Sequence, residues 1–238
     1  MLFSPIKIAD LELSNRIAVA PMCQYSAVDG VMTDWHTQHL MQLGYSGAGL
    51  VMIEATAVER IGRITHHCTG IYNDFCEQSI KKIIDQAKSV SPINTAFGIQ
   101  LAHAGRKSST QRPWEGRKSL TEEENPWRTA APSSIAFDEG WHIPDYIENK
   151  DLERIKNKFV EAALRSVKVG FDLIEIHGTH GYLLHQFLSS ISNQRNDNYG
   201  GTLENRMRFP LEVFKAIRDA LPNKFPLGMR ITGTEWDK

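Results

Sequence analysis

The chain has 238 residues, of which 41% are hydrophobic, which is enough to bury the core of one large domain or two small ones. It carries 27 Lys and Arg against 28 Asp and Glu, so its net charge is −1, and no block of like charges stands out. Nucleic acid and anionic membranes are therefore not expected as partners.

The predicted elements begin with a small hairpin, whose arms 6–9 and 12–13 flank Asp10 and Leu11. Short apolar runs then alternate with helical patterns of period 3.6. In chain order these are a strand at 17–20, a helix at 35–43 capped at Thr33 or Asp34, a strand at 50–54, a helix at 75–87, a strand at 95–101, a helix at 151–169 stopped by Gly170, a strand at 173–176, a helix at 203–221 and a strand at 227–231.

Strands and helices that alternate in this way indicate βαβ units and a parallel sheet covered by helices. The predicted fold class is α/β, a parallel (β/α)8 barrel of the TIM type. This chain supplies about the first five of the eight strands that such a barrel needs. We expect one incomplete barrel domain over residues 1–238. Segment 105–150 interrupts the alternation of strands and helices and holds four of the ten prolines. We therefore expect it to be an excursion over the rim of the barrel.

The three cysteines, Cys23, Cys68 and Cys76, form no Cys-x-x-Cys motif. An odd count without that spacing argues against a disulfide framework or a zinc ribbon, and it fits a reducing compartment. Segment 1–7 is too short and too polar for a signal peptide, and no apolar run approaches the ~20 residues that span a bilayer. We therefore expect a cytoplasmic protein.

Reactive groups of parallel barrels lie where the strands end. After the first strand, Cys23 and Tyr25 place a thiol and a phenol where they could face one ligand. Taken alone, Cys23 fits a small buried hydrophobe better. Ala55, after the second strand, allows a flat ligand to approach the backbone or simply packs tightly. Gln100, in the third strand, suits the edge of a heterocycle or caps the strand.

The fourth strand is the most informative, because His177, His180 and Tyr182 lie within six residues of its end. Two N–H donors that meet one ligand oxygen stabilise developing charge, and loss of one such donor typically costs about 2.7–4 kcal/mol. A nearby tyrosine can deliver a proton. A His-x-x-His pair also occurs in metal sites, but no third ligand stands at a fixed spacing, so no metal is expected.

The fifth strand carries Arg230 between apolar neighbours. This pattern predicts a buried guanidinium, which needs an anionic ligand or several acceptors. The alternative is an internal ion pair with Glu175.

Together these segments resemble the Old Yellow Enzyme family of flavin-dependent ene-reductases. The matching stretches follow the order of the family across essentially the whole chain, and Cys23 with Tyr25 resembles its bacterial subgroup with a cysteine beside the flavin. The stretches are residues 2–5, 15–17, 20–23, 98–107, 177–183 and 195–206.

The resemblance implies FMN over the barrel mouth, reduced by NADPH or NADH at the same site. Pro21, Met22, Cys23 and Ala55 would contact its ring, Gln100 would bond its pyrimidine edge, and Arg230 would neutralise charge there. His177 and His180, helped by Tyr25, would hold the carbonyl or nitro oxygen of a small activated alkene. A hydride would pass from flavin N5 to the β-carbon, and Tyr182 would protonate the α-carbon. Segment 195–206 would be structural.

Family members continue through three further strands. The chain is therefore expected to be a fragment of a longer protein, half of a barrel completed by another polypeptide, or a non-catalytic remnant that cannot hold FMN. The intact motifs favour the first. A homo-oligomer is possible for the full-length form, and a metal-dependent hydrolase that uses His177 and His180 is a further alternative function.

Overall fold

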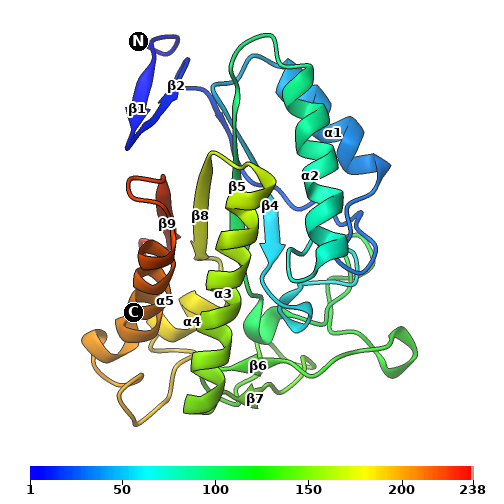
Figure 1. Cartoon of the computed structure of the whole chain (residues 1–238). Coiled ribbons are helices and arrows are strands. Elements are labelled where there is room, and N and C mark those ends of the chain that lie inside the picture. The colour runs from blue at the N-terminus through cyan, green and yellow to red at the C-terminus, as the bar shows by residue number, and fades with distance from the viewer. Residues whose placement is uncertain (237–238) are drawn as a thin grey trace.

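Five strands form one curled, parallel sheet in the computed structural model, which describes residues 1–236 (Figure 1). Each strand pairs in parallel with the next one along the sheet. In order they are β3 (Ala18–Val19), β4 (Leu50–Ala57), β5 (Ala96–Ala102), β8 (Leu173–Gly178) and β9 (Leu227–Ile231). The predicted α/β fold is therefore confirmed as about half of a TIM-type barrel. Strands β4, β5 and β8 run beyond the predicted ends, because their ladders continue past the apolar residues into the polar ones.

The four predicted helices are present within two residues of their predicted bounds, and a short fifth helix was not predicted. They are α1 (Asp34–Tyr45), α2 (Asp74–Ser89), α3 (Asn149–Val169), α4 (Leu183–Leu188) and α5 (Leu203–Ala220). Thr33 caps α1, where its backbone N–H donates to His36 Nδ1 at 3.0 Å. Gly170 ends α3 in a left-handed conformation with φ of 98°, which glycine adopts without strain. No helix within residues 1–236 is long and apolar enough to cross a membrane.

The hairpin closes the amino end of the inner face of the sheet. Strands β1 (Ile6–Ile8) and β2 (Leu11–Leu13) pair in antiparallel fashion. The predicted turn is wrong by one residue, because Leu11 pairs with Ile8 and leaves Ala9 and Asp10 to turn. Leu13 is buried against the apolar side chains at the amino ends of β4 and β5.

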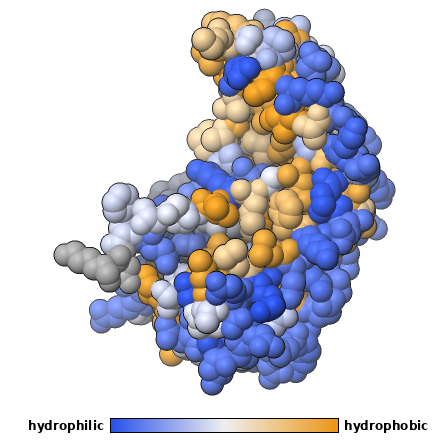
Figure 2. Space-filling model, turned by 90° about the vertical axis from the view of Figure 1, so that its left-hand side faces the viewer, coloured by the Kyte–Doolittle hydropathy of each residue, from blue (hydrophilic) through white to orange (hydrophobic). Residues whose placement is uncertain are grey.

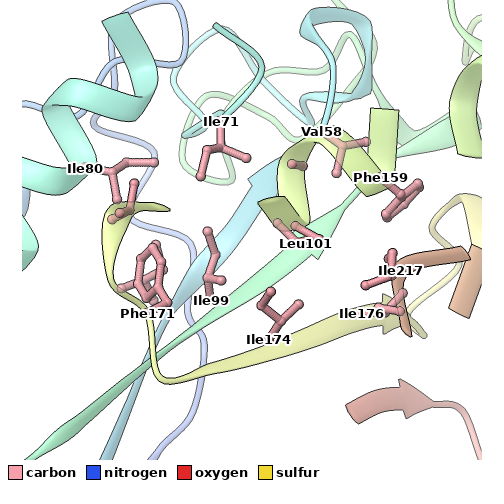
Figure 3. Close-up of a cluster of buried hydrophobic side chains, with 14 of the residues drawn as sticks. Val58, Ile71, Ile80, Ile99, Leu101, Phe159, Phe171, Ile174, Ile176 and Ile217 are labelled. Atoms are coloured by element: carbon pink, nitrogen blue, oxygen red, sulfur yellow. The ribbon is translucent and has the colours of Figure 1, made fainter. Parts of the chain in front are cut away.

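The main core lies between the sheet and its helices. Ile99, Leu101, Ile174 and Ile176 point outward from β5 and β8, and Phe159 of α3 packs with them in the same buried cluster (Figure 3). These side chains are completely buried. Burial of one such side chain stabilises the fold by about 1.5–3 kcal/mol, so this layer holds the curved sheet to its outer helices.

The segment between β5 and α3 passes over the carboxyl ends of the strands, at the opposite end of the sheet from the hairpin (Figure 1). Arg195 holds the end of this segment in place. Its guanidinium donates to the Ile147 carbonyl at 2.6 Å and to the Asp197 carboxylate at 2.6 Å. The short elements here, and one after β4, are η1 (Arg60–Gly62), η2 (Gly105–Lys107), η3 (Glu122–Glu124), β6 (Ala130–Ala131) and β7 (Asp145–Tyr146).

Helix α5 does not bury all of the apolar face that its periodicity predicts. Ile217 is fully buried, but Leu203 and Leu211 are 54% and 53% exposed. They line a groove of about 810 Å³ together with Leu188, Met207, Pro210, Phe214, Met229 and Ile231. Figure 2 faces this side and shows apolar atoms gathered between polar regions. The groove exists because β9 is an edge strand of the sheet in residues 1–236.

Candidate active site

The inner face of the sheet becomes polar toward the carboxyl ends of its strands. The register places Ala55, Gln100 and Glu175 side by side in one layer. His177 and Arg230 pair in the next layer toward the carboxyl ends. Because side chains on a strand alternate between two faces, both layers face the inside of the curled sheet. The predicted site residues of four different strands are thus brought to one mouth.

A β-bulge in β4 directs Ala55 into this layer. Glu54 has no partner in β5, since Ile53 and Ala55 pair with successive residues of that strand. Such an extra residue turns the side chains that follow it to the other face. The Glu54 carboxylate lies 3.2 Å from His36 Nε2 of α1 and accepts from the Gln24 backbone N–H at 3.1 Å. The charge of Glu54 is therefore held toward α1, and the small methyl group of Ala55 faces the mouth.

The predicted His, His, Tyr cluster is assembled at the end of β8. The His177 ring centroid lies 5.3 Å from that of His180 and 5.0 Å from that of Tyr182. His177 is only 3% exposed, and its Nδ1 atom is buried without a hydrogen-bond partner among residues 1–236. A buried polar atom left unpaired costs free energy, so native structures rarely leave one without a use. The Nδ1 atom of His177 is thus a candidate hydrogen-bonding position for a ligand.

The turn that carries His180 is left-handed, with φ of 58° at His180 and 73° at Gly181. Residues other than glycine seldom adopt this conformation, and the neighbours of His180 hold it there. The Gly181 N–H donates to His185 Nδ1 at 2.7 Å, and Gln186 Nε2 donates to the Gly181 carbonyl at 2.7 Å. The sequence analysis missed His185 and Gln186, whose only signal is their position in α4, just after the histidine cluster. They fix the turn from which Tyr182 leads into α4.

The protonation of the cluster follows from its burial. Burial, then His180 and Arg230, lower the pKa of His177 to about 3. Burial and the same arginine also lower the pKa of His180. Both imidazoles are therefore neutral near pH 7, and each keeps one N–H to donate. Burial, with smaller effects from Cys23 and Tyr25, raises the pKa of Tyr182 well above its usual range. The phenol of Tyr182 is therefore protonated near pH 7.

The segment after β3 forms another side of the mouth. Met22 is exposed, and Pro21 and Cys23 are half-buried, so Cys23 is not an enclosed core residue. Burial, then Cys68 and Glu54, raise the pKa of the Cys23 thiol. Tyr25 has φ of 51°. The centroid of its ring lies 5.8 Å from that of Trp114, with the two ring planes nearly perpendicular. An aromatic side chain of the rim excursion thus packs against the predicted substrate-binding tyrosine.

Two sequence predictions about charge at this mouth need correction. Arg230 is exposed, so the prediction of a buried guanidinium is wrong for the chain as described. Its side chain is open because β9 is an edge strand. Among residues 1–236, Arg230 also forms no ion pair with Glu175. Glu175 Oε1 instead accepts a hydrogen bond of 2.6 Å from Gln100 Nε2, and Gln100 is 2% exposed.

The mouth fits a flat ring system with polar edges. Ala55 leaves room for a ring to approach β4, and Gln100 places an amide in the same layer. Arg230 supplies a positive charge with no carboxylate partner in the described chain, and the unpaired Nδ1 of His177 lies one layer further along. A flavin ring has a flat apolar body and a hydrogen-bonding pyrimidine edge. The side chains present therefore match the ring of FMN in chemistry.

Five parallel strands with their reactive side chains at the carboxyl ends define a TIM-barrel protein that binds its ligand at the mouth. Comparison with known proteins agrees. The chain belongs to the NADH:flavin oxidoreductase / NADH oxidase family, which it matches over residues 1–237. The resemblance to the Old Yellow Enzyme family is thereby confirmed.

Individual relatives are similar over almost the whole chain. It is 45% identical to NADH:flavin oxidoreductase FG08077 of Gibberella zeae over 98% of this chain and 57% of the relative. It is 39% identical to NADPH dehydrogenase of Listeria monocytogenes over 99% of this chain and 64% of that protein. The chain therefore spans less than two thirds of the length of these curated relatives.

Two solved structures have the same fold. Old Yellow Enzyme from Pichia sp. AKU4542 superposes with a TM-score of 0.83 at 28% identity, over 97% of this chain and 59% of that one. Morphinone reductase superposes with a TM-score of 0.81 at 28% identity, over 97% and 61%. The half-barrel is thus similar to the corresponding part of larger barrels.

Proposed function

We propose that this chain is the substrate-binding part of an FMN-dependent NAD(P)H oxidoreductase that reduces activated C=C bonds, such as those of enones and nitroalkenes. The observation that carries the proposal is the cluster of two neutral histidines and one protonated tyrosine beside a layer that fits a flavin ring. Family membership supports the flavin and a nicotinamide reductant. One relative is named for NADPH and another for NADH, so the proposal keeps both as candidate reductants.

The side chains that would hold FMN come from three strands, β4, β5 and β9, and from the segment after β3. Pro21, Met22, Cys23 and Ala55 would contact its ring. Gln100 would bond the pyrimidine edge, and Arg230 would offset negative charge there. When bound, FMN supplies hydride transfer chemistry, which takes two electrons from NAD(P)H and delivers them to the β-carbon of the alkene.

The protein itself polarises the substrate and supplies the proton. His177 and His180 donate their N–H groups to the carbonyl or nitro oxygen, which gains negative charge as the β-carbon accepts the hydride. Tyr25 would assist them. Tyr182 then donates its proton to the α-carbon, and the resulting phenolate recovers a proton from water. One hydride and one proton are thus added across each double bond.

The test uses the purified chain, incubated with FMN and desalted. We expect a retained visible flavin band that NAD(P)H bleaches and that an enone restores, with one NAD(P)H consumed for each enone reduced. His177→Ala should retain the flavin band but restore it far more slowly with the enone. A colourless chain would reject independent flavin catalysis.

A second candidate is a non-catalytic part of such an enzyme that does not hold FMN alone. Two observations favour it, the exposed Arg230 and the apolar groove beside β9. It predicts a colourless chain that aggregates through the groove. A metal-dependent hydrolase has less support, since residues 1–236 contain no group of three or more His, Cys, Asp or Glu side chains placed to hold a metal ion.

A further inference from the structure

Lys107 reaches the His, His, Tyr cluster from the loop after β5. Its Nζ atom donates to the carbonyl oxygen of His180 at 2.9 Å. The same ammonium lies 5.0 Å from the centroid of the Tyr182 ring and 4.5 Å from that of Phe137, a residue of the rim excursion. Lys107 thus contacts both the left-handed turn and the aromatic ring of the proposed proton donor.

The ammonium of Lys107 has no carboxylate partner within ion-pairing distance in the part of the chain that the structure describes. Burial, then Arg117 and Arg106, lower its pKa to about 8. Lys107 is therefore expected to lose its charge near pH 8, whereas an ordinary surface lysine loses it near pH 10.5. The titratable and charged groups that act on it or lie beside it are Arg106, Arg117, His177, His180, His185 and Tyr182.

We propose that Lys107 is a positioning residue for the reduction proposed above: its ammonium holds the His180 turn through the His180 carbonyl and favours release of the Tyr182 proton. This inference rests on the proposed function only for its catalytic consequence. Loss of a proton turns the Tyr182 phenol into a phenolate, which attracts a cation over its ring more strongly than the neutral phenol does. The cation thereby offsets part of the effect of burial, which opposes ionisation of Tyr182.

The first test measures Lys107 directly, in the 238-residue chain without any cofactor. NMR of 13C,15N-labelled lysine should show one side chain that titrates near pH 8, and its signal should be absent in Lys107→Met and Lys107→Arg. The backbone amides of His180, Gly181 and Tyr182 should titrate with the same midpoint in the wild type and lose that titration in Lys107→Met. A Lys107 signal that titrates near 10.5, with turn amides that do not follow it, overturns the proposal.

The second test separates positioning from mere structural support. In the FMN-loaded chain, enone reduction should fall above about pH 8, since Lys107 loses its charge there. Lys107→Met should reduce the rate about 10- to 100-fold at pH 7 and lose this alkaline limb. Lys107→Arg, which keeps its charge to pH 12 and above, should recover most of the rate and also lack the limb. An alkaline limb of equal midpoint in all three proteins overturns the proposal. A chain that binds no FMN refutes the proposed function, whereas the NMR result still decides the role of Lys107 in the turn.

Discussion

The imidazole rings of His177 and His180 meet edge to face, with their centroids 5.3 Å apart and their planes at 76°. Two charged imidazolium rings would repel each other at this distance, and Arg230 and Lys107 already bring positive charge to both. The arrangement therefore requires neutral rings. It lets the mouth offer two N–H donors to a ligand oxygen without adding charge of its own.

The low pKa of His177 should make the protein less stable in mild acid. The unfolded chain binds a proton at this histidine below about pH 6.5, whereas the folded chain resists protonation until about pH 3. Stability therefore falls as pH drops through this window, by at most about 1.4 kcal/mol per pH unit. His177→Asn cannot titrate, so its free energy of unfolding should depend less on pH. Urea unfolding of both proteins at pH 7, 6 and 5 measures the difference. Parallel pH profiles would mean that His177 titrates normally.

Tyr182→Phe should separate the two halves of the proposed reaction. The ring and its packing against His177 remain, but the proton for the α-carbon is lost. Reduction of the flavin by NAD(P)H should keep its rate, while reoxidation by an enone slows about 100-fold or more. Stopped-flow absorbance of the flavin measures the two steps separately. Tyr45→Phe, which removes a hydroxyl from an exposed ring on α1, is the matched control and should change neither step. Equal reoxidation rates in Tyr182→Phe and the wild type would rule out this proton donor.

Gly105→Ala should destabilise the loop after β5 more than Gly140→Ala does. Both glycines have positive φ, 61° and 75°, so strain of about 1–2 kcal/mol is common to both variants. A Cβ at Gly105 would lie 2.3 Å from Gln186 Oε1, whereas none of the atoms around Gly140 is within 4 Å. Gln186 cannot retreat without losing its bonds to Gly181 and Arg106. Urea unfolding should show an additional loss of about 1–3 kcal/mol in Gly105→Ala. Equal losses would mean that Gln186 moves freely.

Leu211→Ala and Ile217→Ala should differ strongly, although the sequence places both residues on one apolar face of α5. Ile217 is fully buried, so its truncation should cost about 2–5 kcal/mol in the free energy of unfolding. Leu211 is 53% exposed and lines the groove, so its truncation should cost less than about 1 kcal/mol. Thermal or urea unfolding of the 238-residue chain measures both. A large loss in Leu211→Ala would show that the groove is covered in solution, for example by a second copy of the chain.

The strands and helices were predictable because their patterns are local. Buried strands such as β4 contain continuous apolar runs, and α3 follows the 3.6 period up to Gly170. The position of the cluster at the end of β8 was predictable for the same reason, since strand ends meet at one rim of a parallel barrel.

What escaped prediction depends on neighbours that are distant in the sequence. The apolar flanks of Arg230 predicted burial, but exposure at β9 depends on what lies beside that strand. The exposed side of α5 was missed for the same reason. Gln186 was missed because its importance comes from the two backbone segments that it joins, and neither makes it distinctive in the sequence. Side-chain contacts across the fold decide these cases, and periodicity cannot report them.

Because of the bulge at Glu54, one extra residue decides which side chains of β4 face inward after Ile53. If β4 paired without that irregularity, the Glu54 carboxylate would take the inward position now held by Ala55. The contact of Glu54 with His36 therefore helps to hold the bulge at this position of β4. A change at His36, on a helix outside the mouth, would reach the ligand site by shifting which side chains of β4 face inward, without touching any residue that lines it.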